Sequence, residues 1–278
     1  MLFDALLEPT GLSRRDVDDL RWFGVAGALC TAREVEAPAT AAAWRRAWED
    51  LAGPTLARLR RRGFAAYAAL GVPPLRIPWR GLEELLAEMP EWLSRPGVVA
   101  IGPVGLDRAT DREAMVLGRQ LALDAELRLP VLLSTPSRGK VEATRRSLAL
   151  VREAGLDPRR VLVGHADART VRLVRAVGCA AVVAAGGGDG AGAIDRAVRL
   201  VRTLGAEGLV IASGAGEGAA DLLALPRAAD RMERLGLSDA VIRRVCGRNA
   251  LAALGLEPSS VRSRARASSA RSGRPPSR

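Results

Sequence analysis

The sequence predicts a single (β/α)8 TIM barrel followed by a disordered basic C-terminal tail. Short apolar runs alternate with longer amphipathic stretches from the first residue to about residue 255, in about eight pairs. Several of these runs are apolar on both faces, as parallel strands covered by helices must be. The 278 residues are 48% hydrophobic, which is sufficient for a large core. A doubly wound open sheet is the main alternative, but eight units and no early Gly-x-Gly-x-x-Gly disfavour it.

The predicted strands are the short apolar runs. They cover residues 2–7, 25–31, 64–71, 98–103, 131–134, 161–165, 180–184 and 209–213.

The predicted helices are the amphipathic stretches between these runs. They cover residues 14–23, 41–62, 82–93, 111–127, 140–154, 168–177 and 193–204, with a last stretch over 221–254 in two pieces. Ser13 and Ser238 have the character of N-caps, since each is followed by acidic residues in the first turn. Gly155 and Gly205 follow helical stretches, where a left-handed C-cap favours glycine. The barrel domain is therefore predicted to span residues 1–256 and the tail residues 257–278.

The net charge of +11 is concentrated in part at the C-terminus. From Pro258 onward there are six arginines and no acid, so about +5 remains on the preceding chain. Such a tail predicts disorder and, at most, weak nonspecific contact with polyanions. The three cysteines are far apart and are expected to be buried thiols. No apolar run is long enough to span a membrane and the start does not resemble a secretion signal, so a cytoplasmic protein is expected.

Three segments carry a resemblance to a known family. They are residues 98–107 (VVAIGPVGLD) with 120–123 (QLAL), residues 129–136 (LPVLLSTP), and residues 160–165 (RVLVGH), supported by Arg248-Asn249. In order and spacing the chain resembles the TatD-like metal-dependent hydrolases of the amidohydrolase superfamily, and within them the EboC-type branch. The resemblance covers roughly residues 1–256 and implies a metal site at the C-terminal rim of the barrel.

The resemblance also identifies the positions of the family's metal ligands. In the family the first strand ends with an aspartate and then two histidines separated by one residue; here Asp4 is retained, but the histidine positions are Leu6 and Glu8. The glutamate that bridges two metals on the fourth strand corresponds to Pro103.

One of the remaining positions is retained and the others are altered. The fifth-strand histidine corresponds to Ser134, whereas the sixth-strand histidine is retained as His165, the only histidine of the chain. The eighth-strand aspartate falls near Gly216, with Glu217 and Asp221 as neighbouring candidates.

These replacements predict that the two-metal site is lost. Metal-assisted hydrolysis needs a cation to acidify water and polarise the scissile bond. Leu6 and Pro103 have no donor atoms in their side chains, and a neutral serine hydroxyl is a poor ligand. We therefore expect no metal cofactor and a non-catalytic binding or accessory protein in a small-molecule pathway, with an unknown small molecule or protein as its partner.

Two other hypotheses remain open. In one, the chain is an active hydrolase of phosphodiester or related bonds, with manganese, iron or zinc held by His165, Glu8 and Glu217. In the other, glycine-rich loops bind phosphate through backbone amides, without metal. That hypothesis rests on Gly187, Gly188, Gly214 and Gly216, although Asp189 and Glu217 would repel an anion.

Overall fold

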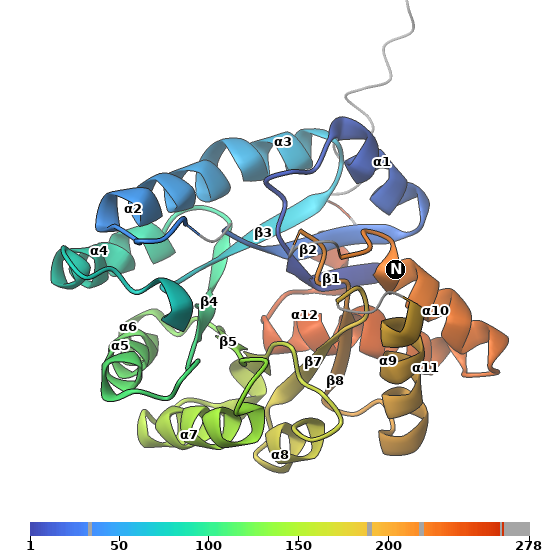
Figure 1. Ribbon diagram of the computed structural model, residues 1–278. Helices are drawn as coiled ribbons and strands as arrows, with labels where there is room; N and C mark the ends of the chain where they lie inside the picture. The colour runs from blue at the N-terminus through green and yellow to red at the C-terminus, as the bar shows by residue number, and fades with distance from the viewer. Residues whose placement is uncertain (33–34, 188–190, 217–219, 262, 264–278) are drawn as a thin grey trace, which may run out of the picture.

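The structure is a computed structural model that describes residues 1–32, 35–187, 191–216, 220–261 and 263. Eight parallel strands follow one another around a single sheet in chain order, which confirms the predicted barrel (Figure 1). The strands are β1 (Leu2–Leu7), β2 (Val25–Thr31), β3 (Ala65–Leu70), β4 (Val98–Gly105), β5 (Val131–Ser134), β6 (Val161–Val163), β7 (Ala180–Ala184) and β8 (Leu209–Ala212).

The barrel is nearly closed between its first and last strands. Beyond the end of β8, Leu7 forms an isolated parallel bridge with Ala215. The Gly214 amide donates to the Leu6 carbonyl at 3.1 Å, and the Glu8 amide donates to the Ala215 carbonyl at 2.8 Å. The first and last strands are therefore joined at the C-terminal rim, where barrel enzymes place their active sites.

Helices surround the barrel (Figure 1). They are α1 (Arg14–Trp22), α2 (Ala41–Asp50), α3 (Leu56–Arg61), α4 (Leu82–Leu93), α5 (Asp111–Leu121), α6 (Asp124–Leu127), α7 (Lys140–Glu153), α8 (Val171–Ala176), α9 (Ala191–Leu204), α10 (Ala224–Arg234), α11 (Asp239–Arg243) and α12 (Asn249–Ala253).

Two of the predicted long helices contain a π-helical turn. Leu51–Thr55 joins α2 to α3, and Arg244–Arg248 joins α11 to α12. Pro54 lies within the first of these turns and has no amide hydrogen to donate to the helix, which accounts for the local change of period.

The predicted helix caps are confirmed. The Ser13 hydroxyl accepts a hydrogen bond from the Asp16 amide in a capping box, and the Ser238 hydroxyl accepts one from the Val241 amide. Gly155 and Gly205 adopt positive φ angles of 71° and 74° directly after helices.

Two apolar layers form the core. Inside the barrel, side chains that include Phe3, Leu29, Tyr67 and Leu132 fill the space between the strands. Outside it, the strands pack against the helices. Three indoles that the sequence places on helices, Trp44, Trp48 and Trp92, are buried here with successive ring centroids 6.3 Å and 5.9 Å apart.

The chain continues to pack on the barrel just beyond the predicted domain boundary. Residues 258–261 are helical, and Val261 is fully buried against the interior layer that contains Phe3. The helical residues therefore extend into the segment predicted as a disordered tail. Most of that segment, residues 262 and 264–278, lies outside the described residues.

The cysteines and the helix lengths agree with the expectations above. Cys30, Cys179 and Cys246 are free and buried, and burial raises the pKa of the Cys179 thiol to about 12. Of the helices that the structure describes, none combines the length and the apolar character needed to cross a bilayer.

Candidate functional site

A cavity of about 660 Å³ opens at the C-terminal mouth of the barrel. All six positions carried over from the family border it: Leu6, Glu8, Pro103, Ser134, His165 and Gly216. They come from several different strands or strand ends spread over more than 200 residues of sequence. The transfer by resemblance is therefore spatially consistent, and we call this space the mouth cavity.

The side of the mouth cavity next to β1 and β4 is apolar. Leu6 is only 4% exposed, and its methyl groups face the backbone of Gly164 on the neighbouring side of the cavity. Pro103 lies within β4 and is partly buried. At the two positions where the family has a histidine and a bridging glutamate, this chain therefore offers hydrocarbon to the cavity.

Glu8 lies at the edge of this apolar side. Its carboxylate oxygen Oε1 accepts a hydrogen bond from the Thr10 amide at 2.7 Å, and its own amide donates to Ala215. The second histidine position is thus occupied by a carboxylate that is already engaged with its own loop.

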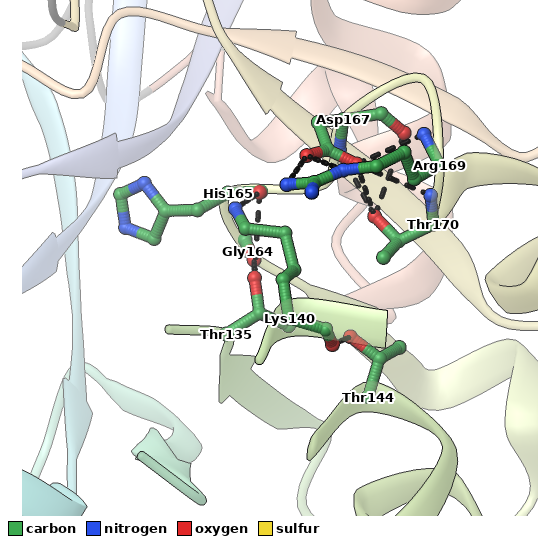
Figure 2. Close-up of polar contacts among 8 residues, drawn as sticks. All are labelled: Thr135, Lys140, Thr144, Gly164, His165, Asp167, Arg169 and Thr170. Atoms are coloured by element: carbon green, nitrogen blue, oxygen red, sulfur yellow. Dashed lines mark hydrogen bonds and ion pairs between the residues drawn. The ribbon is translucent and has the colours of Figure 1, made fainter. Parts of the chain in front are cut away.

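The side next to β5 and β6 is polar and internally bonded. The Thr135 hydroxyl donates to the Gly164 carbonyl at 2.8 Å, and the Lys140 ammonium donates to the His165 carbonyl at 2.6 Å. Figure 2 shows that the His165 imidazole points away from the adjacent loop of Asp167, Arg169 and Thr170. These bonds connect the loop after β5 to the end of β6 and fix this part of the rim.

His165 has an unusual backbone conformation. Its φ angle is +55°, in the left-handed region that non-glycine residues seldom adopt. It lies between two backbone bonds, from the Gly164 amide to Leu133 on β5 and from the Ala166 amide to Val182 on β7. The predicted sixth strand runs to residue 165, but β6 ends at Val163 because the chain turns here.

Two ionisable groups beside His165 have shifted pKa values. Burial lowers the pKa of Lys140, against the opposing effect of the nearby Asp167 carboxylate. Burial alone would raise the pKa of Asp167, but hydrogen bonds from Arg169 and the charge of Lys140 outweigh it, so that the pKa is lowered. The cation and the anion thus stabilise each other across the end of β6.

The eighth-strand position has no room for a side chain. A Cβ atom on Gly216 would lie 2.2 Å from the Glu8 carbonyl oxygen, and the φ angle of Gly216 is +90°. Of the neighbouring candidates, Glu217 lies outside the described residues. Asp221 accepts bonds from the Leu223 amide and from Arg227, and it is not among the residues that border the mouth cavity.

The side chains at the mouth do not fit the metal site of the family. Among the residues that the structure describes, no group of three or more His, Cys, Asp or Glu side chains is arranged to hold a metal ion. The cavity is also bordered by the Asp107 carboxylate, which lies 3.9 Å from Arg108. The donor-bearing side chains of Glu8, Asp107, Ser134 and His165 are thus interspersed with the hydrocarbon of Leu6 and Pro103.

The retained aspartate has a structural role. Asp4 is 1% exposed, and its carboxylate accepts bonds from the Ser213 amide at 3.0 Å, the Ser213 hydroxyl at 2.5 Å and the Leu6 amide at 3.2 Å. These bonds join β1 to the end of β8 at the seam of the barrel. An ionised carboxylate that accepts several hydrogen bonds in a buried site contributes strongly to stability.

The glycines proposed to bind phosphate lie in different places. Gly216 borders the mouth cavity, whereas Gly187 borders a second cavity between α8 and α9. Gly214 has a φ angle of +67°, and a Cβ atom there would meet Ala184 at 3.1 Å. Gly188 lies outside the described residues. The described glycines therefore do not line one common cradle.

Sequence reasoning missed two residues of the mouth. Lys140 and Thr135 both border the cavity and bond to carbonyl groups on the neighbouring strand end. Lys140 is the only lysine among 42 basic residues, which was the one signal available. Its partner carbonyl is 25 residues away in sequence, so that no local pattern indicates the contact.

Comparisons with known proteins point to the same type of barrel. No family model matches the chain. An uncharacterised metal-dependent hydrolase of Methanocaldococcus jannaschii is 28% identical over 162 residues, which are 58% of this chain and 64% of the relative. The match thus spans less than two thirds of that curated relative.

Solved structures share the fold. The TatD-like protein of Archaeoglobus fulgidus superposes with a TM-score of 0.76 at 22% identity, covering 91% of this chain and all of that one. The phosphotriesterase homology protein of Escherichia coli superposes with a TM-score of 0.62 at 15% identity, covering 89% and 95%. The chain therefore shares its (β/α)8 barrel fold with these two proteins.

Proposed function

We propose that this protein is a TatD-like barrel, of the EboC-type branch, that has lost the two-metal site and binds a small molecule without metal-assisted hydrolysis. The observation that carries the proposal is the shared position of the six family sites. Because Leu6, Pro103, Ser134 and the others border one cavity, their chemistry can be assessed together. Two of the six are hydrocarbon, one is a glycine that excludes a side chain, and a single imidazole remains.

The cavity itself is suited to a small molecule. Its volume of about 660 Å³ lies within the range of small-molecule sites, and it combines apolar walls with a few fixed polar groups. The serine, lysine and imidazole on the β5–β6 side offer directional contacts. A role as an accessory protein in a small-molecule pathway and a cytoplasmic location are predictions from the sequence.

The decisive experiment is metal analysis of protein purified without metal-affinity resin or chelator. We expect bound zinc, manganese and iron to be far below one ion per chain. We also expect no manganese-dependent hydrolysis of bis(p-nitrophenyl) phosphate, and the same results for His165→Ala.

A gain-of-ligand variant provides the matched control. Leu6→His, Glu8→His, Pro103→Glu and Ser134→His together restore the donor types of the family at four positions, and this variant should retain more metal than the wild type if it folds. Stoichiometric metal in the wild type that is lost in His165→Ala would contradict the proposal. It would instead support a single-metal site around that imidazole.

A further inference from the structure

A second cavity of about 650 Å³ lies outside the barrel, between α8 and α9 and over the end of β7. We call it the α8–α9 groove. Its floor is apolar, formed chiefly by Val183, Leu200 and Leu204. Its edges carry three arginines, Arg172 on α8 and Arg196 and Arg199 on α9.

The helix on one side of the groove, α8, is shorter than predicted. The sequence predicts a helix over residues 168–177, but α8 covers only Val171–Ala176. The preceding residues form a turn in which the Asp167 carboxylate accepts bonds from the Arg169 and Thr170 amides, at 2.9 Å and 3.2 Å (Figure 2). A carboxylate that accepts bonds from the amides two and three residues further on acts in the manner of a helix N-cap, so that the chain turns tightly here before α8 begins at Val171.

The charge of the groove is positive. Among its described lining residues Asp167 is the single carboxylate, and this group is already paired with Arg169 at 2.9 Å. Arg196 and Arg199 are three residues apart on α9 and therefore on the same side of that helix. In the described part of the chain, no carboxylate lies within ion-pair distance of Arg172 or Arg199.

We propose that the α8–α9 groove binds a small amphipathic anion, with its carboxylate or phosphate head on Arg172 and Arg199 and its chain on the apolar floor. Guanidinium groups form paired hydrogen bonds with both kinds of head group, and the apolar floor accepts a short alkyl chain. The volume of about 650 Å³ is that of a small-molecule site. The site is distinct from the mouth cavity and does not depend on the function proposed for it, although His165 borders both.

Calorimetric titration tests the ligand class directly. The probes are octanoate and octyl phosphate below their micelle concentrations, with octanol, acetate and inorganic phosphate as controls. We expect both amphipathic anions to bind and each control to bind at least about tenfold more weakly, because it lacks either the charge or the chain. Octanol binding as tightly as octanoate, or inorganic phosphate as tightly as octyl phosphate, would overturn the proposal.

Variants locate the binding. Arg199→Gln and Arg172→Gln should each weaken octanoate binding about tenfold through loss of a charge-assisted contact. Arg152→Gln is the control, since Arg152 is exposed on α7 and does not border the groove. Equal weakening by Arg152→Gln and Arg199→Gln would indicate diffuse electrostatic attraction and contradict the site.

Two further variants separate the groove from the mouth. Leu200→Trp should fill the groove and abolish octanoate binding, with circular dichroism confirming that the variant folds. Ser134→Trp should fill the mouth cavity and leave octanoate binding unchanged. Loss of binding in Ser134→Trp alone would assign the anion to the mouth, and binding to anionic vesicles without binding of octanoate would assign the arginines to a lipid surface; either result overturns the proposal.

Discussion

The two sides of the barrel mouth differ in their chemistry. On the β1–β4 side, Leu6 and Pro103 present hydrocarbon to the cavity. On the β5–β6 side, Ser134 and His165 keep polar side chains, and Thr135 and Lys140 bond to the carbonyls at the end of β6. The polar side is held by bonds within the protein itself. Its rim can therefore keep its shape without an ion.

Asp4 is a polar group next to the apolar side that has a structural role. Three of its hydrogen bonds go to β1 and to the residue that follows β8. Because the strands meet only through a few contacts at this seam, a buried acceptor there stabilises the closed barrel.

Removal of this carboxylate is expected to cause a large loss of stability. Asp4→Ala leaves the Leu6 and Ser213 amides without their acceptor in a buried site, so we expect a loss of about 3 kcal/mol in the free energy of unfolding. Urea denaturation, monitored by circular dichroism, measures this loss of unfolding free energy.

The control for this prediction is Ser213→Ala. It removes the hydroxyl that donates to Asp4 and accepts from the Ala215 amide but keeps both amide bonds to Asp4, so it should cost less, about 1 to 2 kcal/mol. Equal losses in the two variants would mean that the amide bonds to Asp4 add nothing to stability. Asp4 would then not join β1 to β8 as described.

A second prediction concerns the backbone of the polar side. His165 adopts a φ angle of +55°, which is strained for a side chain with a Cβ atom. Glycine relieves that strain, so His165→Gly should unfold with a free energy about 1 kcal/mol higher than that of His165→Ala. Both variants lack the imidazole, so its contribution to stability drops out of the difference between their unfolding free energies.

Ala109 provides an independent reference, since its φ angle is +54° and it lies outside the mouth cavity. Ala109→Gly should be stabilised by a similar amount, again measured by urea denaturation. If glycine stabilises position 109 but not position 165, other contacts of the His165 turn outweigh the backbone strain.

The strands were the part of the fold most accessible to sequence reasoning. The bounds of β1, β2, β5 and β7 agree with the prediction, because buried apolar runs between polar or glycine-containing segments define both ends of a strand. The end of β6 was wrong by two residues. There the chain leaves the sheet at Gly164 and His165. The position of this turn depends on hydrogen bonds to β5 and β7, which the local sequence does not indicate.

The six positions named by the resemblance all border the mouth cavity, since the carboxyl ends of parallel strands converge at one rim. Their correspondence to metal positions stays a prediction, and the hydrogen bonds of the mouth could not be predicted. The contact between Lys140 and His165 depends on how the β5 loop folds over β6. The turn that precedes α8 depends on side-chain bonds of Asp167, which an amphipathic pattern does not indicate.

The smallest expected effect is the pH dependence of this Asp167 turn. The pKa of Asp167 is lower in the folded protein than its ordinary value of 3.8, so that its carboxylate stabilises the fold above about pH 4 and ceases to do so as the pH falls through the lower, folded value. Asp167→Asn should therefore cost less than about 1 kcal/mol at pH 7, because the group is partly exposed and screened by solvent. Urea denaturation between pH 7 and about pH 3 should show this cost shrinking on acidification.

The cost should also be smaller at pH 7 in a Lys140→Met background, since the ammonium is one of the groups that hold the carboxylate ionised. If the cost of Asp167→Asn stays constant across the pH range, the charge of Asp167 does not contribute. The residue would then act only through hydrogen bonds that an asparagine also accepts. In that case the β5–β6 side of the mouth would owe its order to Thr135 and the backbone rather than to the ion pair beside His165.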